Sequence, residues 1–259
     1  MANTTGVSNW GVRVYGAAAV LFGVIGLRWD DFAAVWQPVP AELGHRGLLA
    51  YVAAMLFLCA GIAVQFRATR AWGALALGVL FAPYAGLWLR RVVAFPGMIG
   101  TWSGAGEEVA LVTAGLLAYV QFGGVGRRWE SGMAVGSRVL FALSFVSLAL
   151  AHWIALKETA GFVPKWIPPG QRFWAIATGL FHMMAAVAIG SGVQGKLAAR
   201  LLTAMIAVFG LTIWLPALVA SPREHFVWCA NAQNLGLLGA AWVVADWFGV
   251  EGGGEGRGR

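Results

Sequence analysis

Apolar and polar residues follow one another along this chain in long blocks rather than at short intervals. Stretches with few or no Asp, Glu, Lys or Arg recur from end to end, each close to the ~20 residues that a membrane-spanning helix needs. They cover residues 10–27, 47–66, 71–89, 109–126, 139–156, 173–195, 201–222 and 226–245. The pattern predicts an all-α integral membrane protein with eight transmembrane helices.

An internal repeat divides these helices into two sets of four. Residues 96–119, PGMIGTWSGAGEEVALVTAGLLAY, return 126 positions later as residues 222–245, PREHFVWCANAQNLGLLGAAWVVA. Under this shift of 126 positions, Trp102 corresponds to Trp228. The carboxylate pair Glu107 and Glu108 falls on the amide pair Gln233 and Asn234. Each half is therefore expected to be one structural unit.

Four helices per unit is an even number, so both units should cross the membrane in the same direction. The sequence thus predicts two four-helix bundles as parallel repeats, related by an axis along the membrane normal. The expected divisions are residues 1–128 for the first bundle, 129–249 for the second and 250–259 for a Gly-rich disordered tail. A modest majority of the Lys and Arg residues favours an orientation with both termini in the cytoplasm.

Composition agrees with a bilayer environment. The chain is 59% hydrophobic and 11% charged, and its mean hydropathy is +0.73. Its 14 Trp residues and net charge of +7 suit lipid headgroups, which become the expected partners, and no basic stripe points to nucleic acid. Cys59 and Cys229 lie in separate apolar runs without metal-ligand spacing, so we expect neither a disulfide nor a metal site.

The first loop of each half contains Trp residues, then prolines, then a basic residue that opens the next helix. The loops read WDDFAAVWQPVPAELGHR in the first half and FVPKWIPPGQR in the second. We expect both to lie as short helices in the membrane interface. Their aromatic residues then either fix the depth of the protein or form a lid over a pocket.

Together these features resemble the DoxX/DoxD-like family of small bacterial membrane proteins. The resemblance rests on four helices per unit, a first loop with Trp and Pro, and a last helix reading NLGLLGAAWVVAD at residues 234–246. It implies a location in the bacterial cytoplasmic membrane. It also implies, for some members, a link to quinone-coupled oxidation of sulfur compounds. Most members carry one unit, so the duplication departs from their pattern, and no active-site residue transfers to this chain.

Charged residues near one end of the first bundle form the main candidate site. Glu107 and Glu108 are expected to begin the fourth helix, and Arg90 and Arg91 to end the third on the same membrane side. One interpretation is structural, since a helix N-terminus favours carboxylates and nearby arginines neutralise them. The other is a polar site for a quinone head, an anion or a proton, covered by the side chains of Trp36 and Trp102.

His152 and His182 form a second candidate because both are expected at the same depth on neighbouring antiparallel helices. Paired imidazoles ligate a b-type haem in some membrane proteins. We rank a hydrogen bond within the helix packing first, a quinone contact or proton relay second and haem last.

The sequence leaves three classes of function open and contains no catalytic motif. We favour an accessory or quinone-associated subunit that partners a membrane oxidoreductase complex. A carrier or binding protein for lipids or other small molecules is the alternative, and a self-standing enzyme comes third. A carrier should have broken helices at corresponding places in both halves. The sequence has a mid-helix proline, Pro83, in the first half, whereas Pro216 lies towards a helix end.

The predicted orientation can be tested by cysteine labelling. A thiol reagent that cannot cross the membrane should label Ala41→Cys in intact cells and should label Ser131→Cys only after lysis, in a background lacking Cys59 and Cys229. The opposite labelling pattern would mean that the orientation is inverted.

Overall fold

The computed structural model describes residues 9–123 and 127–254, which form helices and turns without any strand. The helices are α1 Trp10–Trp29, α2 Arg46–Gln65, α3 Arg70–Ala94, α4 Ile99–Gly123, α5 Arg127–Ile154, α6 Leu156–Phe162, α7 Gln171–Ser191, α8 Gly195–Phe209, the π-helix η1 Gly210–Trp214, α9 Leu215–Ala220 and α10 His225–Gly254. The predicted all-α class is confirmed for this part of the chain.

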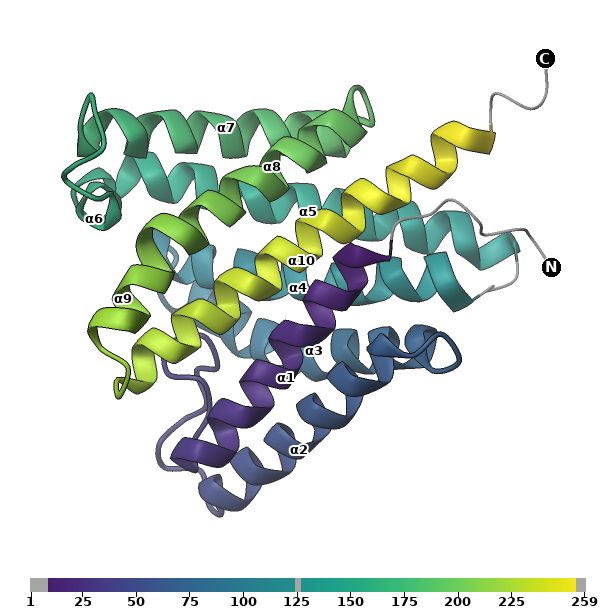
Figure 1. Ribbon diagram of the computed structural model, residues 1–259, viewed down its shortest axis with the longest axis horizontal. Coiled ribbons are helices and arrows are strands. Elements are labelled where there is room, and N and C mark those ends of the chain that lie inside the picture. Colours follow the sequence, from purple (N-terminus) through teal and green to yellow (C-terminus); the bar gives the residue numbers. More distant parts are fainter. Residues whose placement is uncertain (1–8, 124–126, 255–259) are drawn as a thin grey trace.

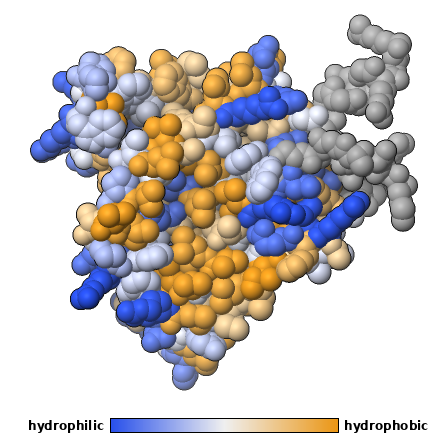
Figure 2. Space-filling model, viewed as in Figure 1, coloured by the Kyte–Doolittle hydropathy of each residue, from blue (hydrophilic) through white to orange (hydrophobic). Residues whose placement is uncertain are grey.

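Six helical segments among the described residues are long and apolar enough to cross a membrane: α1, α2, α3, residues 131–154 of α5, α7, and the continuous rod of α8, η1 and α9. Figure 2 shows apolar side chains over the middle of the visible face and hydrophilic ones towards its two ends. These are the features of a multi-pass membrane protein. The remaining long helices, α4 and α10, contain 25 and 30 residues and carry the polar pairs Glu107–Glu108 and Gln233–Asn234.

The helices form a closed arrangement around α4 and α10. Helix α1 packs on α2 and α10, α3 packs on α4, α4 packs on α5, α5 packs on α7, and α8 packs on α10, while α4 and α10 also contact each other. Figure 1 shows α10 running between α1 and α8, with the start of α1 and the end of α10 on the same side. Helix α6 lies at the opposite end.

Glycines allow the central helices to approach closely. A Cβ atom on Gly239 of α10 would lie 2.4 Å from the backbone nitrogen of Tyr15 in α1, and one on Gly115 of α4 would lie 2.6 Å from the backbone nitrogen of Gly78 in α3. Lipid removes most of the hydrophobic driving force between helices, so close packing of small residues must hold them together. The hydroxyl of Tyr15 also donates to the Leu111 carbonyl at 2.7 Å and ties α1 to α4.

The loop between α1 and α2 differs from the expected interface helix. Residues 30–45 form turns, and Phe32, Ala33 and Gln37 are buried. Arg46 holds the loop in place by pairing with Asp31 at 2.6 Å and donating to the Val39 carbonyl. Two prolines at 38 and 40 prevent continuous helix hydrogen bonding here. In the second half, the corresponding stretch, residues 163–170, also forms turns, and the short helix α6 ends before it.

Several helices extend beyond their predicted bounds. Helix α3 continues through Ala94, and α4 begins at Ile99 rather than near residue 109. Helix α10 continues through Gly254 and so includes the first residues of the predicted disordered tail, whose remainder lies outside the described residues. Charged residues do not interrupt the backbone hydrogen bonds of a helix, so an apolar run underestimates its length.

Replacing Gly239 by Ala should lower the stability of the folded protein. The added methyl group meets the backbone of α1, and overpacking of this kind typically costs about 1–3 kcal/mol. Thermal unfolding of the purified protein in detergent should show a lower Tm. Gly86→Ala is the matched control because nothing lies within 4 Å of its added Cβ. An equal Tm for both variants would contradict the close contact between α1 and α10.

Candidate functional site

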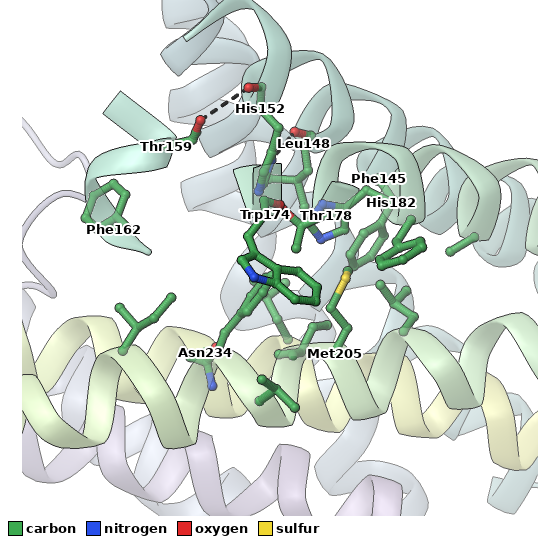
Figure 3. Close-up of a pocket in the computed structure, with 18 of the residues that line it drawn as sticks. Phe145, Leu148, His152, Thr159, Phe162, Trp174, Thr178, His182, Met205 and Asn234 are labelled. Atoms are coloured by element: carbon green, nitrogen blue, oxygen red, sulfur yellow. Dashed lines mark hydrogen bonds between the residues drawn. The ribbon is translucent and has the colours of Figure 1, made fainter. Parts of the chain in front are cut away.

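A cavity of about 900 Å³ lies in the second half of the chain, between α5, α6, α7, α8, η1 and α10. Figure 3 shows side chains of Phe145, His152, Trp174 and His182 facing it from one side and those of Met205 and Asn234 from the other. Three residues of the first half also line it: Trp36, Ser103 and Glu107. The cavity therefore reaches the boundary between the two halves.

Most of the cavity wall is apolar. Leu148, Ala185, Leu202, Ile206 and Leu237 are among its lining residues. The polar side chains in the wall include Ser103, Thr159, Gln194 and Thr212 and, besides these, two groups. One, on α5 and α7, consists of His152, Thr178 and His182; the other, on α4 and α10, consists of Glu107, Gln233 and Asn234. Such a wall suits a mostly apolar molecule with a hydrogen-bonding group.

His152 and His182 lie beside each other, as the sequence predicted. Their ring centroids are 4.8 Å apart, with planes at 61°. Nδ1 of His152 lies 2.8 Å from the Leu148 carbonyl, so this nitrogen carries a hydrogen and leaves Nε2 as an acceptor. Nδ1 of His182 is buried without a hydrogen-bond partner. It is the polar atom of the pair that a cavity ligand could satisfy.

The contact geometry of this pair disagrees with a haem held between the two imidazoles. A bridging haem requires its iron and porphyrin plane to separate the rings, whereas these rings meet edge to face. His182 also packs against Phe145 and Phe209, at centroid distances of 5.6 and 6.2 Å. The pair is therefore part of the packed cavity wall.

Glu107 is held at the boundary of the two halves by two donors. Its Oε2 accepts hydrogen bonds from Nε1 of Trp36 at 2.8 Å and from Nε2 of Gln233 at 3.1 Å. Trp36 is itself fixed, because Nε1 of Trp88 donates to its carbonyl and its ring stacks on Phe226. Trp36 and Glu107, two members of the predicted site, are therefore in direct contact.

Glu108 lies next to Glu107 but does not line the cavity. It is 1% exposed, and its Oε2 has no hydrogen-bond partner. Both glutamates lie about two turns inside α4, so they are not at a helix N-terminus as the apolar pattern suggested. The stabilisation expected from the helix dipole does not reach this depth.

Arg90 and Arg91 do not join this site. Both are exposed in the last turns of α3, where the guanidinium of Arg91 lies over the ring of Trp88. Within the described part of the chain, the ion pair found joins Arg46 to Asp31 and involves neither glutamate. The arginines lie near the helix end while the glutamates lie roughly 12 Å along α4 from its first residue, at ~1.5 Å per residue, so the predicted pairing fails.

Trp102 likewise lies outside the cavity wall. It is 44% exposed, and its Nε1 donates to the Pro96 carbonyl at 2.9 Å. Its hydrogen bond fastens the start of α4 to the preceding turn. Of the two residues predicted to cover the site, Trp36 lines the cavity and Trp102 does not.

Sequence reasoning missed several wall residues, chiefly Trp174, Thr178, Phe209 and Asn234. An amide on an apolar helix is a usable signal, because it must find a partner away from water. Nδ2 of Asn231 shows this, since it donates to the Trp214 carbonyl at 2.9 Å, at the end of η1.

Comparisons of the chain with protein-family models, curated proteins and solved structures find no match.

Replacing His182 by Phe should raise the stability of the ligand-free protein by roughly 1 kcal/mol, because it removes an unsatisfied buried polar atom. His152→Phe should lower stability instead, since it deletes the hydrogen bond to the Leu148 carbonyl. Thermal unfolding of both variants measures the difference. A His182→Phe protein less stable than the His152→Phe protein would show that His182 has a partner.

Proposed function

We propose that this chain is a multi-pass protein of the bacterial cytoplasmic membrane that holds a long apolar molecule with a hydrogen-bonding head, of the quinone class. In this role it would serve as an accessory or quinone-associated subunit of a membrane redox system. The observation that carries the proposal is the cavity of about 900 Å³ with an apolar wall and a few polar groups. Ligand pockets commonly measure about 300–1,000 Å³ and have walls of this composition.

We further propose that eight spans arise from two copies of a four-helix unit. The helix bounds support this: a shift of 126 residues carries the described start of α4, Ile99, to His225 of α10. The buried positions of α1 recur in α5 at the same shift, as Tyr15 and Phe141 illustrate. Those of α2 and α3 recur in α7 and α8 at a shift of 125, as Phe57 with His182 illustrates. A π-helical turn contains more residues than an α-helical turn. The extra residue in η1 therefore changes the shift between the two halves from 125 back to 126.

Contacts between equivalent residues also support the duplication. Glu107 and Gln233, which are 126 positions apart, bond to each other, as residues near a two-fold axis do. Trp102 donates to the Pro96 carbonyl at 2.9 Å, and Trp228 donates to the Pro222 carbonyl at 2.8 Å. The last helix of each unit packs on the first helix of the other, as α4 on α5 and α10 on α1. Each bundle would therefore be closed by a helix of its sister.

The duplication would account for the position of this cavity, mostly in the second half. The core of the first unit holds a cluster of four aromatic residues in mutual contact: Phe22, Phe57, Phe81 and Tyr84. By the shifts above, their counterparts are Leu148, His182, Ile206 and Phe209, and all four line the cavity. All four of these replacements are smaller than the aromatic residue they match, so space that side chains fill in one unit would be open in the other.

The polar groups in the wall fit a quinone head. A quinone carbonyl accepts hydrogen bonds, and the ring of His182, whose Nδ1 has no partner, and the amide of Asn234 can donate them. An isoprenoid tail would lie along the apolar wall formed by Leu202, Met205 and Ile206. The rod of α8, η1 and α9 is the least buried of the six apolar helices. It is thus the wall through which a ligand from the bilayer would enter.

A carrier or binding protein for lipids is the second candidate, and helix irregularities favour it. Pro83 lies inside α3, where it removes one backbone donor, and its counterpart at a shift of 125, Val208, lies two residues before the π-helix η1. Here the N–H of Leu215 bonds to the Gly210 carbonyl five residues back, and Pro216 follows. Broken helices at corresponding places in both units are the feature expected of a carrier.

Refilling the cavity tests the proposed binding function. The variant Leu148→Phe with Ile206→Phe restores the residues found in the first unit. Solvent extraction and mass spectrometry of the purified wild-type protein should yield a quinone or another isoprenoid lipid in near-stoichiometric amount. The amount of this molecule bound to the variant should be at least tenfold lower. Unchanged occupancy in the folded variant would reject the cavity as the binding site.

The reverse exchange, Phe22→Leu with Phe81→Ile, is the matched control. It enlarges the core of the first unit and should keep the co-purified molecule. Its Tm should fall, because truncating buried side chains typically costs about 1–5 kcal/mol.

A further inference from the structure

We propose that Glu107, Gln233 and Glu108 form a binding site for a single proton at the contact between α4 and α10. This site lies beside the cavity and would exist with or without a molecule in the cavity. We call these three residues the carboxyl–amide cluster. Because the cluster lies between the two halves, movement of one half against the other would change the distances between its residues.

Unsatisfied buried oxygens are the first observation behind this proposal. Oε2 of Glu108 and Oε1 of Gln233 are buried acceptors without a donor, in side chains that are 1% and 2% exposed. The side-chain amide of Gln233 donates to Glu107 and also lies within interaction range of Glu108. A hydrogen on Glu108 would supply a donor to this group of acceptors. Buried polar atoms rarely remain unpaired, so such a group indicates a missing donor.

The balance of charge is the second observation. Neither carboxylate has an Arg, Lys or His side chain at ion-pair distance in the described part of the chain. A buried charge without a partner costs several kcal/mol, and two adjacent carboxylates also repel each other. One proton shared by the pair removes one of the two charges. A single proton is therefore the smallest occupant that both supplies the missing donor and removes one of the two charges.

Among the residues that the structure describes, no cation pairs with either glutamate. From α1 and α3, the titratable side chains that interact electrostatically with Glu108 are Tyr15 and Tyr84. Tyr15 already donates its hydroxyl hydrogen to the Leu111 carbonyl. From α10 the facing group is the neutral Gln233, and from the 30–45 loop it is the indole of Trp36, which donates to Glu107. From α5, Ser144 and Ser147 face neighbouring Gly106.

Access to the site comes through Glu107. This residue lines the cavity whereas Glu108 does not, so Gln233 connects a carboxylate at the cavity wall to one in the interior. A molecule in the cavity that contacts Glu107 would alter the hydrogen bonds that hold the proton. Proton binding and occupancy of the cavity would then be linked, as proton-coupled carriers require.

Infrared difference spectroscopy of the full-length protein in lipid nanodiscs tests the proton directly. At pH 7 the wild type should show the carbonyl band of a protonated carboxylic acid that shifts in D₂O. Glu108→Gln should abolish it, and Glu158→Gln, a change at an exposed carboxylate, should leave it unchanged. Absence of the band in the wild type, or its persistence in folded Glu108→Gln, would overturn the proposal.

A double variant separates the role of the cluster from that of one position. Glu107→Gln with Gln233→Glu exchanges the two bonded side chains, so the cluster keeps its composition and the band should remain. Loss of the band in this variant, with Tm unchanged, would reject the cluster as the proton site. Loss of the wild-type band when sodium chloride replaces choline chloride at constant pH would identify the occupant as a metal cation instead. None of these readouts requires a cavity ligand, so an empty cavity would refute the proposed function without affecting this result.

Discussion

Close contact of α4 and α10 is the constraint on which the rest of this structure depends. These helices carry polar pairs that are costly to expose to a bilayer, and their contact at the centre allows Gln233 to bond to Glu107. The other long helices then pack around this pair, with glycines such as Gly239 permitting backbones to approach. In lipid, where apolar surface alone does not drive association, small residues and buried polar contacts decide which helices meet.

The two halves differ in how side chains fill their interiors. Where the first half fills its core with aromatic rings such as Phe57 and Phe81, the second has His182 and Ile206, and a cavity results. Under the proposed function, the first half would supply rigidity and the second would supply binding space. A duplicated unit would make this division of roles possible without loss of the central contact.

The cavity and the carboxyl–amide cluster share one wall, and this links the two proposals physically. Glu107 borders the cavity and accepts hydrogen bonds from Trp36 and Gln233, which come from opposite halves. A change in the position of either half would lengthen one of these bonds. The irregular helix segments at Pro83 and η1 lie in the helices best placed to permit such a change.

The sequence by itself determined the all-helical class, the membrane character and the neighbouring positions of His152 and His182, because these depend on hydropathy, helix periodicity and depth. Only the tertiary structure decided which polar residues meet. The spacing of Arg90 and Glu107 suggested an ion pair, but the extended ends of α3 and α4 separate them. Gln233 instead bonds to Glu107 from 126 residues away. Likewise, the cavity depends on the summed volumes of side chains from several helices, a quantity that no single stretch of sequence contains.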